Sequence, residues 1–216
     1  MRDFVFALLG AASGYTSLWR ARKDIAKYRL AGTTFGEGSF TSHTLSMPLV
    51  VVLNASLYVL LSQSYSHDLT ALTFGFLVSA GMRLALIDLD THLLPRRIVY
   101  RAMAFSLLLL FISALVDQHG SVGSMMLGGL AMWMVIQVCE VLSRGGIGKG
   151  DVVFAGFLGL YVGWESITNV FTALVAAFVA GGVIAAVLLI SRRATRSTRF
   201  AFGPFLFFGA LFTVLR

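Results

Sequence analysis

The stretch GGIGKGD, Gly145–Asp151, is a glycine-rich turn that ends in a carboxylate and runs directly into the apolar segment VVFAGFLGLYVGW, residues 152–164. Four glycines in seven residues give the backbone access to positive φ and allow another chain segment to approach closely. A carboxylate at the mouth of an apolar helix is costly and is a functional candidate by default. We therefore expect this turn to hold Asp151 where an ordinary helix start would not.

The composition around this turn is that of an integral membrane protein. Of the 216 residues, 57% are hydrophobic and 12% are charged, which is about half the charged fraction of soluble domains. The mean hydropathy is +0.84. Because a helix needs about 20 apolar residues to cross a bilayer, the chain has room for about eight spans. We predict an all-α, polytopic transmembrane helix bundle, formed by a single membrane domain over residues 1–216.

Apolar runs give the positions of the eight predicted spans. The runs lie at about residues 4–19, 47–63, 69–87, 102–116, 124–142, 152–164, 167–190 and 200–215. The first resembles a signal peptide, but a basic cluster follows it, so we expect a retained span. Residues 20–46 are predicted to form the longest cytoplasmic loop. In the seventh span, Gly181 and Gly182 are expected to allow close helix packing.

The basic residues fall on one side of this layout. Fourteen of the seventeen lie in predicted inner loops: Arg20, Arg22, Lys23, Lys27, Arg29, Arg96, Arg97, Arg101, Arg144, Lys149 and the four arginines of residues 192–199. By the positive-inside rule these loops are cytoplasmic, which places both termini outside. Short clusters of this kind are not the continuous stripe of a nucleic-acid-binding protein. They favour anionic membrane lipids, at about 1 kcal/mol for each basic residue near the surface.

Two aspartates, Asp88 and Asp151, lie at the cytoplasmic ends of predicted spans three and six. When two carboxylates share a site of low dielectric constant, one proton is held between them, so one acts as base and the other as acid. Such a pair can activate water against an amide carbonyl without a metal, and the single cysteine, Cys139, offers no CxxC metal site. The alternative is that each aspartate is a helix cap or an interfacial loop residue. Composition alone does not decide between the two interpretations.

Three segments resemble the motifs of the type IV prepilin peptidases, the bacterial GxGD membrane aspartyl proteases. They are IDLDTHLLPRR at residues 87–97, GIGKGD at residues 146–151 and FGPFLFFGAL at residues 202–211. In that family a proline follows the first aspartate by seven residues, as Pro95 follows Asp88 here. The resemblance covers about residues 47–216. It implies an inner-membrane protease that cuts the short basic leader from prepilins or pseudopilins, for type IV pili or type II secretion, on the cytoplasmic side.

Carried over to this chain, the resemblance makes Asp88 and Asp151 the catalytic pair. Four further residues are expected to bind substrate or to shape the site: Gly148, Lys149, Gly150 and Pro95. Asp90 is the rival of Asp88, but the spacing to Pro95 favours Asp88. We interpret Asp90 as a solvated or supporting carboxylate, and the lone His92 in its polar loop as a hydrated side chain.

The chain also departs from the family. Many members carry a cytoplasmic insert with two CxxC pairs, which binds zinc and is associated with methylation of the new N-terminus by S-adenosylmethionine. Residues 32–46 contain no cysteine, so the chain resembles the short form that lacks this tetracysteine domain. Val51 and Val153 stand where the family often has a glutamate and a basic residue. We therefore predict proteolysis without a cofactor, with S-adenosylmethionine needed only if methyltransferase activity is retained.

Two other classes of function fit a small polytopic protein. One is an ion- or proton-coupled transporter that uses the aspartates to carry a cation, although the sequence has neither an inverted repeat nor a mid-span carboxylate to favour it. The other is a non-catalytic scaffold for a pilus or secretion assembly, in which the aspartates would be dispensable. The sequence leaves the oligomeric state and the identity of the pilin open.

Overall fold

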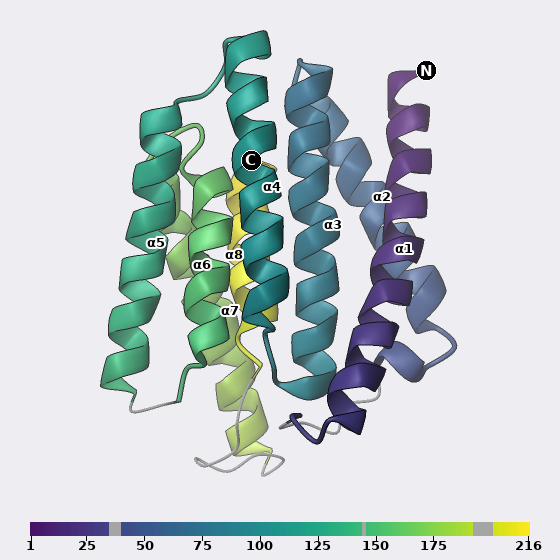
Figure 1. Ribbon diagram of the computed structural model, residues 1–216, viewed down its shortest axis with the longest axis vertical. Helices are drawn as coiled ribbons and strands as arrows, with labels where there is room; N and C mark the ends of the chain where they lie inside the picture. The colour runs from purple at the N-terminus through teal and green to yellow at the C-terminus, as the bar shows by residue number, and fades with distance from the viewer. Residues whose placement is uncertain (35–39, 144–145, 192–200) are drawn as a thin grey trace.

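The protein is a bundle of helices, as the computed structural model in Figure 1 shows. The structure describes residues 1–34, 40–143, 146–191 and 201–216. Its α-helices are α1 (Arg2–Leu30), α2 (Ser46–Ser64), α3 (Asp68–Thr91), α4 (Arg96–Asp117), α5 (Val122–Leu142), α6 (Lys149–Val162), α7 (Thr168–Ile190) and α8 (Gly203–Val214), and a short 3-10 helix, η1 (Phe40–Ser42), precedes α2. The described ranges contain no strand, so the predicted all-α class is confirmed. Gly145, Arg144 and the arginines of residues 192–199 lie outside the described residues.

Five of these helices, α2, α3, α4, α5 and α7, are long and apolar enough to cross a membrane. The others fall short for different reasons. The second half of α1 is basic, whereas α6 has 14 residues and α8 has 12. At 1.5 Å per residue α6 is about 21 Å long, less than the hydrocarbon thickness of about 30 Å. A multi-pass membrane protein is therefore supported, while the eight-span layout with both termini outside stays a prediction.

The first helix is longer than the sequence analysis predicted. Residues 20–30 continue α1 instead of opening the cytoplasmic loop. Ala21 and Ile25 are buried on one face of this extension, while Lys23 and Lys27 remain exposed on the other. This amphipathic pattern lets a basic segment stay helical beyond the apolar run, because its apolar stripe still packs on the bundle.

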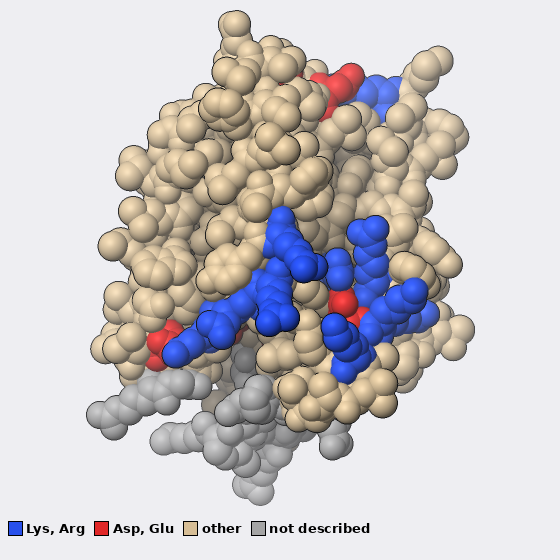
Figure 2. All heavy atoms as spheres, in the orientation of Figure 1, with Lys and Arg blue, Asp and Glu red and all other residues tan. Residues whose placement is uncertain are grey.

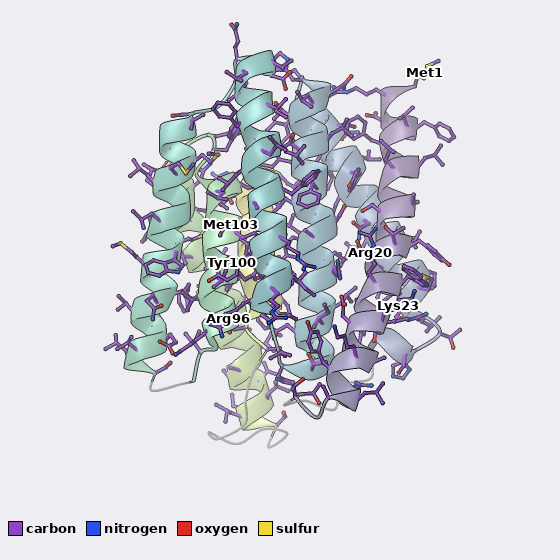
Figure 3. All side chains as sticks on the ribbon, in the orientation of Figure 1. Met1, Arg20, Lys23, Arg96, Tyr100 and Met103 are labelled. Atoms are coloured by element: carbon purple, nitrogen blue, oxygen red, sulfur yellow. The ribbon has the colours of Figure 1, made fainter. Side chains whose placement is uncertain are left out.

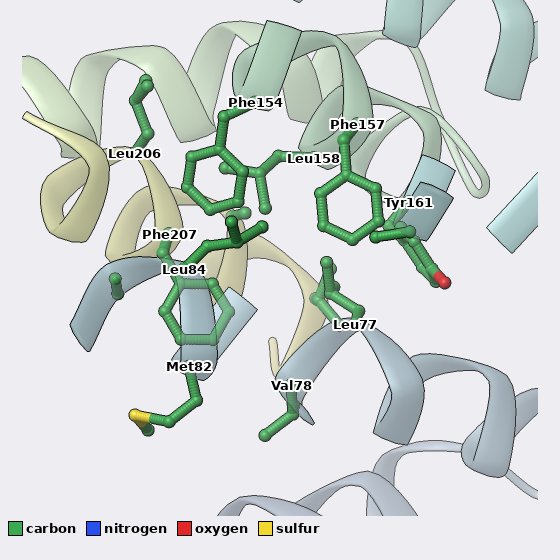
Figure 4. Packing of buried hydrophobic residues seen from close by; sticks show 14 of the residues in the cluster. Leu77, Val78, Met82, Leu84, Phe154, Phe157, Leu158, Tyr161, Leu206 and Phe207 are labelled. Carbon is green, nitrogen blue, oxygen red and sulfur yellow. The ribbon is translucent and has the colours of Figure 1, made fainter. Parts of the chain in front are cut away.

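The centre of the bundle is formed by α3 and α6. Every residue of α6 from Asp151 to Val162 is buried. Figure 4 shows its aromatic side chains facing α3 and α8, and the rings of Phe74 and Tyr161 meet edge to face with centroids 5.2 Å apart. The hydroxyl of Tyr161 donates to Ser106 Oγ of α4 at 2.6 Å, which satisfies its buried polar atom. This packing fixes α6 against α3, and thereby the positions of the acidic residues that the two helices carry.

The tightest helix packing occurs at glycines other than the predicted pair. A Cβ atom on Gly182 would meet nothing within 4 Å, and one on Gly181 would lie 3.3 Å from the ring of Phe202 at the start of α8. Instead, α5 and α6 touch through their backbones, since a Cβ on Gly159 would lie 2.5 Å from the Gly128 carbonyl oxygen. Gly159 and Gly163 have the GxxxG spacing that permits such contacts between membrane helices. The prediction was therefore wrong for Gly182, whereas Gly181 is buried and packs closely against the start of α8.

This contact predicts a stability effect. Gly159→Ala should separate α5 from α6 and lower the free energy of unfolding by about 1–3 kcal/mol, because overpacking forces backbone shifts. The measurement is thermal unfolding of the purified protein in detergent. Gly182→Ala is the matched control in α7, and its unfolding midpoint should not fall. Equal midpoints for the two variants would contradict the inferred contact.

Candidate active site

The N-terminal turn of α6 holds Asp151. Gly148 is the N-cap residue, and Asp151 is the third residue of the helix. The N–H of Gly148 donates to Asp151 Oδ2 at 3.0 Å, and the N–H of Asp151 donates to the Gly148 carbonyl at 3.0 Å. The aspartate thus closes its own turn, in the way that an acidic residue in the first turn often does.

The two oxygens of Asp151 have different environments. While Oδ2 accepts the hydrogen bond from Gly148, Oδ1 is buried and has no hydrogen-bond partner among the described residues. A buried acceptor without a partner destabilises the folded state, and a helix cap requires no such second oxygen. The helix-cap interpretation therefore accounts for one oxygen only, and the other is available to a water or a substrate.

Asp88 lies in the last turn of α3 and is 4% exposed. Its Oδ2 accepts a hydrogen bond from the N–H of Gly203 at 2.9 Å. Gly203 is the first residue of α8, so the carboxylate faces the N-terminal end of that helix, where the helix dipole favours negative charge. The sequence analysis assigned no role to Gly203, although it lies within the FGPFLFFGAL segment.

Leu94 joins the two aspartate-bearing segments. A Cβ atom on Gly150 would lie 2.4 Å from the Leu94 carbonyl oxygen, and one on Gly203 would lie 3.0 Å from Leu94 Cδ1 and 2.8 Å from Asp88 Oδ2. The turn of α6 and the start of α8 therefore both press on the loop that follows α3. Asp88 lies against the start of α8, and Asp151 follows Gly150 directly, so the two aspartates lie at the two segments that contact Leu94. The structure thus places both predicted aspartates around the same loop, at one end of the bundle.

Two further residues were predicted to belong to the site, and their environments differ. Pro95 is buried as the N-cap residue of α4, and its carbonyl accepts from the N–H of Ile98 at 2.9 Å. Its place directly after Leu94 supports a role in shaping the site. Lys149 is exposed at the start of α6, so its role toward substrate stays a prediction.

Asp90 has a structural role that the sequence analysis missed. It is fully buried, and its carboxylate accepts hydrogen bonds from the N–H groups of Phe40 and Thr41, both at 3.0 Å, and from the Thr41 hydroxyl. Residues two apart on a helix project about 200° from one another, which directs Asp90 toward η1 and away from Asp88. The expectation of a solvated Asp90 was wrong, while the expectation of a supporting carboxylate fits.

These bonds predict that Asp90→Asn destabilises the protein more than it slows any reaction. The amide would present an NH2 group to one or two of the three donors that now meet the carboxylate, at a cost of about 1–3 kcal/mol in unfolding free energy. Thermal unfolding in detergent measures this loss. Abolished activity with an unchanged unfolding midpoint would instead place Asp90 in the reaction.

His92 also differs from its prediction. It ends α3 in the left-handed conformation, with φ of 49°. The side chain is half-buried, its Nδ1 has no hydrogen-bond partner among the described residues, and burial lowers the pKa of the imidazole. His92 is thus a partly enclosed side chain rather than a fully hydrated one. No group of three or more potential metal ligands occurs within the described ranges.

Comparisons with known proteins agree with the motifs. Residues 71–190 match the type IV leader peptidase family. The chain is 28% identical over 169 residues to a prepilin leader peptidase/N-methyltransferase of Pseudomonas putida, covering 78% of this chain and 58% of the relative. For the enzyme of the same name from Aeromonas hydrophila, the identity is 29% over 162 residues, covering 74% and 54%. The chain spans about half the length of the curated relatives it matches.

No solved structure matches the chain. The family match nevertheless covers more than half of the chain and includes both Asp88 and Asp151. The same segment contains the loop with Leu94 and the glycine turn that the structure brings together. From this match, the chain belongs to the type IV leader peptidase family.

Proposed function

We propose that the chain is a membrane-embedded aspartyl endopeptidase of the bacterial inner membrane. It removes the short basic leader from type IV prepilins or prepilin-like proteins at the cytoplasmic membrane face. The observation that carries this proposal is that two buried motif carboxylates, Asp88 from α3 and Asp151 from α6, lie around the same Leu94 loop at one end of the bundle. The names of the curated relatives support prepilins as the substrate class.

The two carboxylates would share one proton. Each has an oxygen held by a backbone N–H, from Gly203 on Asp88 and from Gly148 on Asp151. The second oxygen of each is then the one that meets the reactants. The protonated aspartate hydrogen-bonds the scissile carbonyl, while its ionised partner takes a proton from a water that adds to the carbonyl carbon. The proton then passes to the leaving nitrogen as the C–N bond breaks.

An apolar groove leads from this site along α3. The helices α2 and α8 both pack on α3 but not on each other, which leaves a groove of about 980 Å³ between them. Leu89 and Pro204 line one end of the groove, each next in sequence to a site residue, and Leu215 lines the other end. We propose that the apolar helix of the substrate lies in this groove, with its cytoplasmic end at Asp88.

The proposal covers the peptidase activity alone, without a cofactor. The relatives' names also include an N-methyltransferase activity, which uses S-adenosylmethionine. The described residues offer no feature that supports it, and residues 32–46 lack the cysteines associated with it. Lipids surround the groove, and the specific pilin served by the enzyme stays open.

Activity is expected to follow a bell-shaped pH profile, because the reaction needs one proton across the pair. At low pH both carboxyl groups carry a proton and neither accepts one from water, so the rate falls. At high pH both are ionised and neither donates to the carbonyl, so the rate falls again. The measurement is kcat/KM for a prepilin against pH with the purified enzyme. A flat profile from mildly acidic to alkaline pH would count against the shared proton.

A further inference from the structure

A second groove, polar where the first is apolar, lies on the other side of α3. In Figure 1 α1 and α4 flank α3, and both pack on it without contacting each other along their described lengths. The space between them is a pocket of about 420 Å³. Its polar lining consists of the hydroxyl-bearing residues Ser13, Thr16, Ser17 and Ser79 and the arginines Arg20, Arg83 and Arg101.

The three arginines of this pocket are not equivalent. Arg83 is neutralised by Asp24 of α1, whose Oδ2 accepts from its Nε at 2.9 Å and from a terminal nitrogen at 2.6 Å. Arg20 and Arg101 are exposed and make no hydrogen bond or ion pair with any described residue. The pocket therefore has two guanidinium groups without an anionic partner, one on each wall.

The hydroxyl groups make the floor rigid and polar. Ser17 Oγ donates to the Ser79 carbonyl at 3.0 Å, and the hydroxyls of Ser13 and Ser79 are hydrogen-bonded to each other. This network joins α1 to α3. Phe76 and Phe105 also line the pocket and make it apolar at their positions. One pocket thus combines partnerless cations with an aromatic wall.

Aromatic neighbours indicate the depth of the pocket in the membrane. Trp19 and Tyr100, next in sequence to Arg20 and Arg101, are 46% and 51% exposed. Exposed tryptophan and tyrosine on membrane helices mark the level of the lipid headgroups. Figure 3 shows Arg20 and Tyr100 at similar heights on the two sides of α3, and Figure 2 shows lysine and arginine side chains gathered in the lower part of this face. The free guanidinium groups therefore lie where lipid phosphates lie.

We propose that this groove binds the phosphate headgroup of an anionic phospholipid. Arg20 and Arg101 hold the phosphate from the two walls, because guanidinium groups bind phosphate by paired, charge-assisted hydrogen bonds. An acyl chain lies against Phe76 and Phe105. A free inorganic anion would match the arginines but not the aromatic wall, so a lipid fits the whole pocket better. The site is separate from the aspartate pair, and it stands whether or not the chain is a peptidase.

The test is lipid titration of the purified full chain in neutral detergent, followed by native mass spectrometry. Phosphatidylglycerol should bind the wild-type protein more tightly than phosphatidylcholine. The double variant Arg20→Gln/Arg101→Gln should lose about 100-fold in phosphatidylglycerol affinity, since a hydrogen bond to a charged group contributes about tenfold for each arginine. The matched control Lys23→Gln/Lys27→Gln removes two charges from α1 outside the pocket and should keep the affinity within a few-fold.

Two further measurements distinguish a lipid from a free anion and test whether the variants fold normally. Inorganic phosphate at millimolar concentration should not displace phosphatidylglycerol, and full displacement would assign the pocket to a free anion and overturn the lipid proposal. Arg20→Lys/Arg101→Lys should recover only part of the lost affinity, because an ammonium group keeps the charge but not the paired hydrogen bonds, and its unfolding midpoint should be like that of the glutamine variant. Equal losses in the pocket and control variants, or equal affinity for the two lipids, would reduce the effect to general surface charge and overturn the proposal.

Discussion

Asp88→Asn and Asp151→Asn are each expected to reduce prepilin cleavage by about 10²- to 10⁴-fold, the usual contribution of a positioned acid or base. An asparagine neither takes a proton from water nor gives one to the leaving group. Its carbonyl oxygen still accepts the backbone N–H that each aspartate now accepts, from Gly203 or from Gly148. The fold is therefore expected to persist while the chemistry is lost. The measurement is leader removal from a co-expressed prepilin, followed by single-turnover kinetics with purified enzyme.

The chain supplies a matched control on the same helix. Asp90 is two residues from Asp88 and is as deeply buried, but its carboxylate binds the backbone of η1. Asp90→Asn should retain cleavage within about tenfold while it lowers stability. Intact processing in either Asp88→Asn or Asp151→Asn would refute the pair mechanism. Loss of ion flux without any processing phenotype would favour the transporter alternative instead.

The features of this site that lie within a short stretch of sequence could be predicted. The spacing of Asp88 and Pro95 and the GxGD turn each lie within a few residues, and local spacing is what a motif records. By contrast, Gly203 meets Asp88 across 115 residues. That contact depends on how α8 packs on α3, which no local pattern encodes.

Asp90 shows why burial was misjudged. An aspartate near the cytoplasmic end of a span is ordinarily solvated, and the helix period gave no reason to bury it. Its partners, Phe40 and Thr41, lie in a short 3-10 helix that the sequence analysis treated as loop. The end of α1 was also mispredicted. Its many basic residues indicated a loop, although Ala21 and Ile25 form an apolar stripe that is buried against the bundle. In both cases burial depends on contacts between elements that are distant in sequence.

Gly150→Ala is expected to reduce cleavage by about 100-fold, although the substitution is chemically small. Gly150 lies in the first turn of α6, so its backbone would accept alanine without strain of its own. The obstacle is Leu94, because the new Cβ would lie 2.4 Å from its carbonyl oxygen and 2.6 Å from its Cβ. Backbone must then move, and a displacement of about 1 Å between reacting groups costs about 10²-fold. The measurement is kcat for leader removal.

Gly148→Ala provides a graded comparison within the same turn. Its Cβ would lie 3.1 Å from Asp151 Oδ2, the far end of a side chain that can shift slightly. We therefore expect a smaller loss of activity for Gly148→Ala than for Gly150→Ala, and none for Gly182→Ala in open space. Leu94 also contacts the start of α8 at Gly203. A displacement of Leu94 by the new Cβ atom in Gly150→Ala should therefore shift both aspartates. Wild-type kcat in Gly150→Ala would mean that the contact between this turn and Leu94 does not set the distance between the two carboxylates.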